Sequence, residues 1–124
     1  MKGYFVHIES DTVVNSNFRK VLFTGPKLQL VLMSLKPGEE IGSEIHEEHD
    51  QFFRFEKGTG KVIIGEDTFE VKDGDTVIVP AGEQHNIINT SQSEELKLYT
   101  IYAPPEHADG TIHKTKEEAM QTEH

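Results

Sequence analysis

Side chains that can bind divalent metals gather in two stretches of this chain. They are Glu44, His46, His49, Gln51 and His85. Imidazole nitrogens combined with carboxylate and amide oxygens are suitable ligands for Mn, Fe(II) or Zn. The chain has no cysteine, which excludes thiolate ligands and disulfide bonds. The chemistry these residues could support is therefore metal binding by nitrogen and oxygen donors.

The first stretch, residues 38–58, resembles the first motif of the cupin superfamily. The family pattern is Gly, five residues, His, one residue, His, three or four residues, Glu, six residues and Gly. The corresponding residues here are Gly38, Glu44, His46, Gln51 and Gly58. Every spacing is kept, while a Glu replaces the first His and a Gln replaces the Glu.

The second stretch, residues 74–89, resembles the second cupin motif without exception. The pattern of Gly, Pro, Gly, His and Asn falls on Gly74, Pro80, Gly82, His85 and Asn89. The resemblance covers about residues 28–103, and the fifteen residues between the two motifs are typical of small cupins. The chain is also similar to bacterial and archaeal cupins that carry Glu-x-His and a later Asp-Gln in motif one.

The resemblance implies an all-β fold, the cupin double-stranded β-helix, which is a barrel of the jelly-roll kind. We expect one cupin domain over residues 1–124, because 124 residues are enough for one core but not for two. Residues 104–124 form a C-terminal tail in this interpretation. A Thr115-x-x-Glu118 capping box predicts a short helix in that tail.

The resemblance also implies a set of metal ligands, namely Glu44, His46, Gln51 and His85. This set carries one negative charge, as the usual three His and one Glu do. An amide oxygen replaces one imidazole, which favours a divalent first-row ion such as Mn, Fe or Zn over Ni or Cu. The alternative is a polar cluster without metal whose members hydrogen-bond to one another.

Apolar periodicity indicates the strands that would hold these ligands. We expect strands near residues 2–9, 18–23, 28–35, 76–79 and 96–102, a hairpin over 61–64 and 68–71, and a polar loop over 11–17. Alternation along 41–46 would place Glu44 and His46 on one face. In the same way Gln51 would share a face with Phe53 and Phe55, and His85 with Ile87 and Asn89.

The other histidines are expected outside the ligand set. His49 lies among Glu47, Glu48 and Asp50, where the family pattern has no ligand, so we interpret it as a solvated loop residue. His7, His107, His113 and His124 are expected at the surface. The segment 104–113 could instead fold over the mouth of the barrel, and the sequence leaves this open.

The leading functional hypothesis is a metal-dependent enzyme that acts on a small polar metabolite inside the barrel. Isomerase, lyase and dioxygenase chemistry all occur on this fold. The motifs contain no second conspicuous acid or base, so proton transfer would fall to Glu44, a tyrosine or water on the metal. The alternative is a non-catalytic sensor that holds a metal or a small ligand, and a structural or storage role comes third.

Charge and composition restrict the classes of partner that this protein is expected to bind. A formal net charge of -10 argues against nucleic acid and anionic membranes, which need clustered Lys and Arg. No apolar run is long enough to span a membrane, and the first residues lack a signal peptide's apolar core, so we expect a cytoplasmic protein. The run from Leu28 to Leu35 is apolar on both faces, and Ile45 and Phe52 should point outward. These features predict a homodimer formed by sheet packing.

Overall fold

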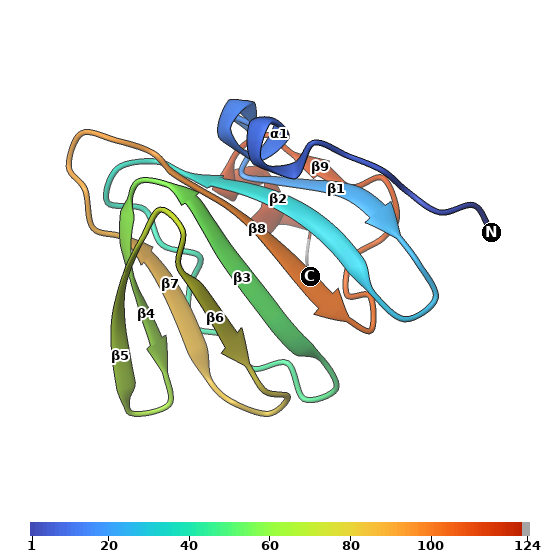
Figure 1. The fold of residues 1–124 in the computed structure, drawn as a ribbon. Helices are drawn as coiled ribbons and strands as arrows, with labels where there is room; N and C mark the ends of the chain where they lie inside the picture. The colour runs from blue at the N-terminus through green and yellow to red at the C-terminus, as the bar shows by residue number, and fades with distance from the viewer. Residues whose placement is uncertain (123–124) are drawn as a thin grey trace.

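Two antiparallel sheets make up the fold of this chain, whose computed structural model describes residues 1–122 (Figure 1). The strands are β1 (Arg19–Thr24), β2 (Gln29–Leu35), β3 (Asp50–Lys57), β4 (Thr59–Ile64), β5 (Asp67–Lys72), β6 (Thr76–Val79), β7 (His85–Asn89), β8 (Leu96–Ala103) and β9 (Ile112–His113). The helices are α1 (Ile8–Val14) and α2 (Lys116–Thr122). The predicted all-β fold with a short C-terminal helix is confirmed.

Six strands form the larger sheet in the order β6-β3-β8-β2-β1-β9, and three form the smaller one in the order β5-β4-β7. The core lies between the sheets, because side chains alternate inward and outward along each strand. Phe53 and Phe55 of β3, Ile87 of β7 and Leu98 of β8 are almost completely buried there. The predicted inward faces of β3 and β7 are confirmed.

Turns in both motifs use glycines that the sequence marks. Gly58, Gly74 and Gly82 have φ angles of 97°, 92° and 88°, a region that side chains with a Cβ rarely adopt. Asn89 ends the second motif and ties three segments together. Its Nδ2 donates to the carbonyl oxygens of Leu35, Lys36 and Glu94, so its role in the fold is structural.

The N-terminal expectations were wrong. Residues 8–14 form helix α1 instead of part of an edge strand and a loop, and residues 1–7 form no strand. The edge of β1 is occupied at Arg19 and Lys20 by β9, which pairs them with His113 and Ile112. Thr12 of α1 is fully buried, and the Lys97 ammonium donates to Asn15 O at 2.6 Å just after the helix.

The strand expected over 41–46 is an extended segment with only two isolated bridges, Glu40 with Ile88 and Glu44 with His85. Gly42 interrupts the pairing with a φ of 112°. Its N–H is bound by the side chain Oδ1 of Asn86, at 2.9 Å, instead of by a strand. Glu44 and His46 are thus carried by an irregular segment.

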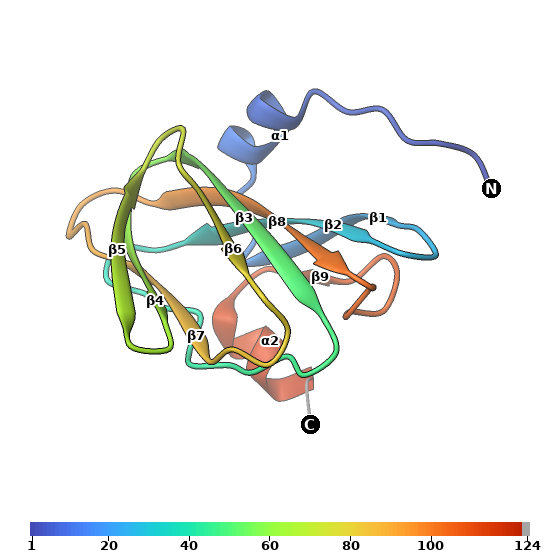
Figure 2. The same cartoon turned by 60° about the horizontal axis from the view of Figure 1, so that its bottom comes forward.

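The helices lie on opposite faces of the six-stranded sheet (Figure 2). α1 covers one end of the outer face, and α2 lies on the side of the smaller sheet. The Thr115 hydroxyl accepts a hydrogen bond from Glu118 N at 3.2 Å, as the predicted capping box requires, and Ala119 is buried. Within residues 1–122, no helix has the length and apolar character needed to span a membrane.

Candidate metal centre

A backbone bridge fixes two of the candidate ligands side by side. Glu44 N–H donates to His85 O, and His85 N–H donates to Glu44 O, both at 2.9 Å. This pairing joins the irregular 41–46 segment to the first residue of β7. The two side chains therefore start from adjacent backbone positions.

His85 is oriented by its second ring nitrogen. Nδ1 donates to the Glu83 carbonyl oxygen at 3.1 Å, which leaves the lone pair of the imidazole on Nε2. Nε2 is buried and has no hydrogen-bond partner among the described residues. Burial lowers the pKa of His85 and so favours the neutral ring. A neutral imidazole held by a backbone carbonyl is the usual state of a metal-ligating histidine.

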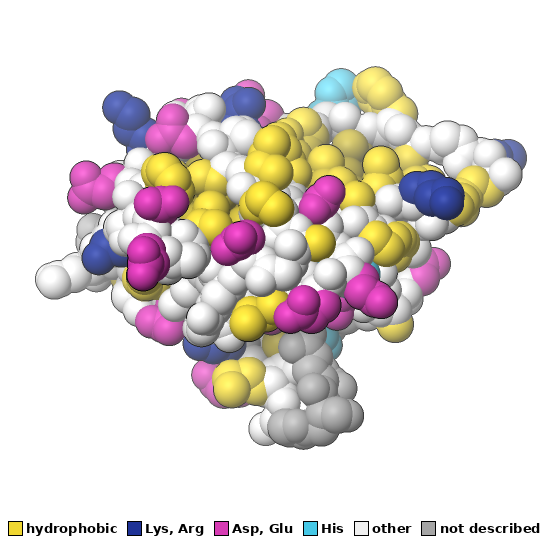
Figure 3. Space-filling view, turned by 90° about the horizontal axis from the view of Figure 1, so that it is seen from below, with side chains coloured by type: hydrophobic (Ala, Val, Ile, Leu, Met, Phe, Trp, Pro, Cys, Tyr) yellow, Lys and Arg dark blue, Asp and Glu magenta, His cyan; other side chains and the backbone are white. Residues whose placement is uncertain are grey.

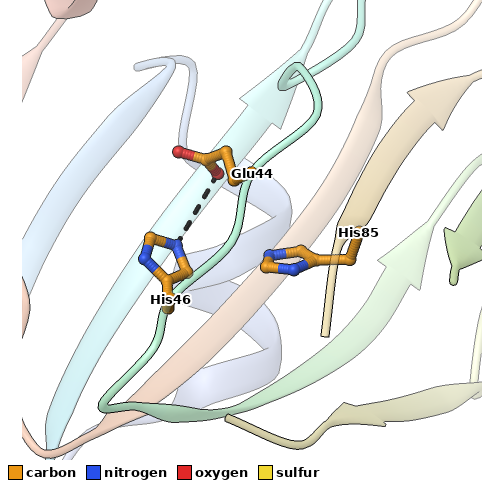
Figure 4. A group of neighbouring side chains, drawn as sticks. All are labelled: Glu44, His46 and His85. Carbon is orange, nitrogen blue, oxygen red and sulfur yellow. Dashed lines mark ion pairs between the residues drawn. The ribbon is translucent and has the colours of Figure 1, made fainter. Parts of the chain in front are cut away.

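His46 completes a group of three donors. Its carbonyl oxygen accepts from Gly82 N at 2.9 Å, which anchors the segment beside the turn before β7. His46 Nε2 lies 3.8 Å from Glu44 Oε1. One donor atom each from Glu44, His46 and His85 lies within 4.8 Å of the others. Figure 4 shows the two rings pointing toward one another, with the Glu44 carboxylate beside His46.

Gln51 faces inward from β3 and is 3 % exposed. Its Nε2 donates to the Thr100 hydroxyl at 3.0 Å, which orients the amide. Its Oε1 is buried and has no hydrogen-bond partner among residues 1–122. A buried amide oxygen without a donor is costly, and a metal ion would satisfy it. Gln51 thus holds an oriented, buried amide oxygen on a different strand from the three-donor group.

A cavity of about 500 Å³ opens beside these donors. Its lining residues are Glu44, His46, Glu106, His107, Ala108, Thr111 and His113. Most of them belong to residues 104–113, here called the covering segment. The covering segment therefore folds over the site, which answers the question that the sequence left open.

His49 is not a solvated loop residue, and that expectation is corrected. Its side chain is only 16 % exposed, and Nε2 lies 2.8 Å from Glu106 Oε2. Its Nδ1 lies 2.6 Å from the Pro104 carbonyl oxygen. The covering segment supplies both contacts, which a loop residue with only its sequence neighbours could not make. The ring of His49 is 5.9 Å from that of His46, so it stands next to the ligand group.

His107 and His113 are likewise not at the surface. His113 is 9 % exposed, and His107 Nε2 lies 3.2 Å from the Tyr102 hydroxyl. Burial, reinforced by the charge of Arg19, lowers the pKa of His107 to about 3. Burial also raises the pKa of Tyr102. His7 is exposed, as expected, and His124 lies outside the described residues.

Comparison with known families decides the classification. The model of the cupin domain family matches residues 31–102, which include both motifs. This chain belongs to the cupin family. The cupin motifs account for the positions of Glu44, His46 and His85 around one site, while the covering segment lies beyond the matched residues.

Two relatives and one solved structure are similar over most of this cupin. The uncharacterized protein YrkC of Bacillus subtilis is 47% identical over 128 residues, which cover 98% of this chain and 68% of YrkC. The uncharacterized protein L612 of Acanthamoeba polyphaga mimivirus is 47% identical, over 88% of this chain and 70% of L612. The crystal structure of BH2720 from Bacillus halodurans has a TM-score of 0.95 at 46% identity, over 98% of this chain and 96% of BH2720.

Sequence reasoning missed the polar residues of the covering segment. Glu106, His107 and His113 follow the last long strand of this cupin, outside both motifs. One signal was available, because three charged or titratable side chains after a strand that ends at the site can fold back onto it. Periodicity carries no such information, since the covering segment is mostly irregular.

Proposed function

We propose that this cupin binds one divalent first-row transition metal through Glu44, His46, Gln51 and His85. We further propose that it is an enzyme, which uses this metal to act on a small polar molecule. The observation that carries the proposal is the convergence of three donor atoms within 4.8 Å, two of them on Glu44 and His46, which line a cavity. The donor set has one carboxylate, two imidazoles and one amide, which suits Mn, Fe or Zn.

The chain's own contacts prepare this site. The Glu83 carbonyl sets the tautomer of His85. The Thr100 hydroxyl accepts a hydrogen bond from the Gln51 amide nitrogen, which leaves the amide oxygen available to a metal ion. Such outer contacts orient ligands before binding. When bound, the ion would act as a Lewis acid toward an oxygen of the substrate. The cavity volume of about 500 Å³ suits a small metabolite.

Catalysis, as opposed to sensing, is favoured by groups that can transfer protons beside the donors. His49 and Glu106 are 2.8 Å apart, and His46 Nδ1 lies 3.6 Å from Glu106 Oε2. Glu106 is therefore within reach of a molecule in the cavity, which it lines. Proton abstraction or donation at this carboxylate, supported by His49, suits an isomerase or lyase reaction.

The test of metal binding is elemental analysis of protein purified without chelator. We expect close to one first-row divalent ion per chain in the wild type and a large loss in a His46→Ala, His85→Ala double variant. The matched control is His7→Ala, which removes an exposed histidine. Equal metal content in all three proteins would refute the proposal. Native mass spectrometry of the same samples would identify any retained small molecule.

We also propose that two copies associate through the outer face of the six-stranded sheet. The strand register aligns one apolar residue from each of five strands across that face. They are Ile78, Phe52, Ile101, Leu30 and Phe23. Ile78 is 61% exposed. An apolar row across an antiparallel sheet can pair with the same row of a second copy about a two-fold axis, which supports a homodimer.

A further inference from the structure

Gln29 is a polar residue inside the apolar core. It is the first residue of β2, is fully buried, and shares the inward face of that strand with Val31 and Met33. An amide that is removed from water is costly unless its donors and acceptors find partners. The side chain of Gln29 is therefore expected to bind other polar groups within the fold.

The side-chain amide of Gln29 makes four hydrogen bonds, which is the full capacity of an amide. Its Oε1 accepts from Glu106 N at 3.1 Å and from His107 N at 2.9 Å. Its Nε2 donates to His107 O at 2.8 Å and to Thr24 Oγ1 at 2.9 Å. Three of the four partners are backbone groups of the covering segment, so Gln29 ties β2 to residues far along the chain.

The covering segment depends on such contacts because residues 104–108 lie outside the strands and helices. Backbone N–H and C=O groups that no strand pairs need other partners. The N–H donors of Glu106 and His107 can face only the amide oxygen of Gln29, and the His107 carbonyl can face only the amide nitrogen. One orientation of the amide satisfies all three groups, which no apolar side chain could do.

A fixed backbone at Glu106 also places its carboxylate. Glu106 Oε2 lies 2.8 Å from His49 Nε2 and 3.6 Å from His46 Nδ1, and Glu106 lines the cavity. Only the torsions of the Glu106 side chain separate this carboxylate from the N–H that Gln29 binds. Glu106 is therefore held by Gln29 through its backbone and by His49 through its side chain.

This constraint matters because the surroundings of Glu106 are acidic. Glu44 lines the same cavity. The formal net charge is -10, and acidic side chains are prominent on the face shown in Figure 3. Like charges repel a carboxylate from such a place. Gln29 opposes this displacement through the backbone, and its neutral amide adds no charge that would compete for the Glu106 carboxylate.

We propose that Gln29 is a positioning residue, which fixes the backbone of Glu106 and thereby holds the Glu106 carboxylate beside His49 at the cavity. The inference rests on the proposed function, in which this carboxylate transfers a proton. Glu44 and His85 are joined by their own backbone hydrogen bonds, independently of Gln29. Loss of the Gln29 amide should therefore loosen the covering segment without releasing the metal ion.

The first experiment measures amide hydrogen exchange by NMR in the purified holoprotein. In the wild type, the amides of Glu106 and His107 should exchange at least about a hundredfold more slowly than those of an unstructured peptide. Gln29→Met fills a similar volume without these bonds. It should speed exchange at both amides by about tenfold more than in the core strands. Thr24→Val removes only the fourth bond of Gln29 and should leave exchange at both amides unchanged.

Two outcomes of this experiment would overturn the inference. One is a lack of protection at Glu106 and His107 in the wild type, a result that stands even if Gln29→Met does not fold. The other is an acceleration in Gln29→Met that is no larger at these two amides than in the core strands, since the effect would then be a general loss of stability.

A double-mutant cycle tests whether Gln29 acts through Glu106. Glu106→Gln removes the charge that faces His49, and its effect on urea unfolding should be about halved or less in the Gln29→Met background. Ser34→Ala is the matched control, because Ser34 is a buried polar residue near the other end of β2. It should leave the effect of Glu106→Gln unchanged. An effect of equal size with and without the Gln29 amide would contradict the inference.

Metal content of the same samples separates this inference from the proposed function. Wild type and Gln29→Met should contain equal amounts of metal. A loss of metal in Gln29→Met would overturn the inference, because Gln29 would then act on the metal ligands. A wild type that contains no metal but keeps the Gln29-dependent protection contradicts only the proposed function.

Discussion

Glu44 and His85 exchange two backbone hydrogen bonds of 2.9 Å, so their side chains are held adjacent by backbone atoms that an alanine substitution leaves in place. Alanine at His85 therefore deletes a donor without releasing the segment that carries Glu44. A loss of metal in such a variant would report on the ligand and not on the folding of the site.

Gln51→Glu should strengthen metal retention. The change supplies a second carboxylate at the position where the amide oxygen has no hydrogen-bond partner among the described residues. A negative carboxylate within reach of the ion should strengthen metal binding, because its charge is opposite to that of the ion. At the same time, we expect weaker binding of anionic ligands, because the site becomes less positive. Competition with a chelator measures the first effect, and Gln84→Glu, at an exposed position, is the control. Identical metal affinities would remove Gln51 from the ligand set.

Gly58→Ala and Gly74→Ala form a matched pair for stability. Both glycines have φ above 90°, so alanine is strained at either site by about 1–2 kcal/mol. At Gly58 an added Cβ would also lie 2.6 Å from the Glu95 carbonyl oxygen, whereas at Gly74 nothing lies within 4 Å. Urea unfolding should show a clearly larger loss for Gly58→Ala. Equal losses would mean that the backbone near Glu95 moves freely.

Acid should destabilise the metal-free protein through His107. Its pKa is about 3 when folded and 6.5 as a free group, so the unfolded chain takes up a proton first as the pH falls. The contribution of neutral His107 to the free energy of unfolding is fully present above pH 6.5. It is lost from there toward pH 3, by up to about 1.4 kcal/mol per pH unit. Urea unfolding between pH 7.5 and pH 5 checks this. His107→Gln should flatten the dependence, whereas His7→Gln should leave it unchanged.

Ile78→Asp and Phe52→Asp should convert the proposed dimer into monomers. Each places a charge in the apolar row on the outer face of the six-stranded sheet, where Phe52 pairs with Ile78. Light scattering at micromolar concentration gives the mass. Phe69→Asp is the control, since Phe69 is 45% exposed on β5 of the other sheet. A wild-type chain with the mass of a monomer would end the dimer proposal.

The strands of the sandwich could be predicted because their side chains alternate or are apolar on both faces. β2 illustrates this, since six of its seven residues are buried. The two motifs also placed Glu44, His46 and His85 close to one another. These features depend on local spacing, which the sequence displays directly.

The parts of the fold and of the site that were not predicted depend on contacts between segments that are distant in the sequence. His49 is only partly exposed because Glu106 and the Pro104 carbonyl approach it from the other end of the chain. Helix α1 forms where the end of an edge strand and a polar loop had been expected, and it is held by distant contacts, since Thr12 is fully buried and Lys97 donates to Asn15 O. Neither relationship leaves a periodic mark on the residues involved, so no local pattern could have indicated them.

The residues that line the cavity come from two different parts of the chain. Glu44 and His46 come from the segment that is bridged to β7, while Glu106, His107 and His113 come from the covering segment, which is mostly irregular. Loops tolerate sequence change better than sheets do. Substitutions in the covering segment can therefore alter which molecule fits without disturbing the donors. Selection for a different bound molecule would then act on the covering segment, while the proposed metal ligands elsewhere in the chain stay unchanged.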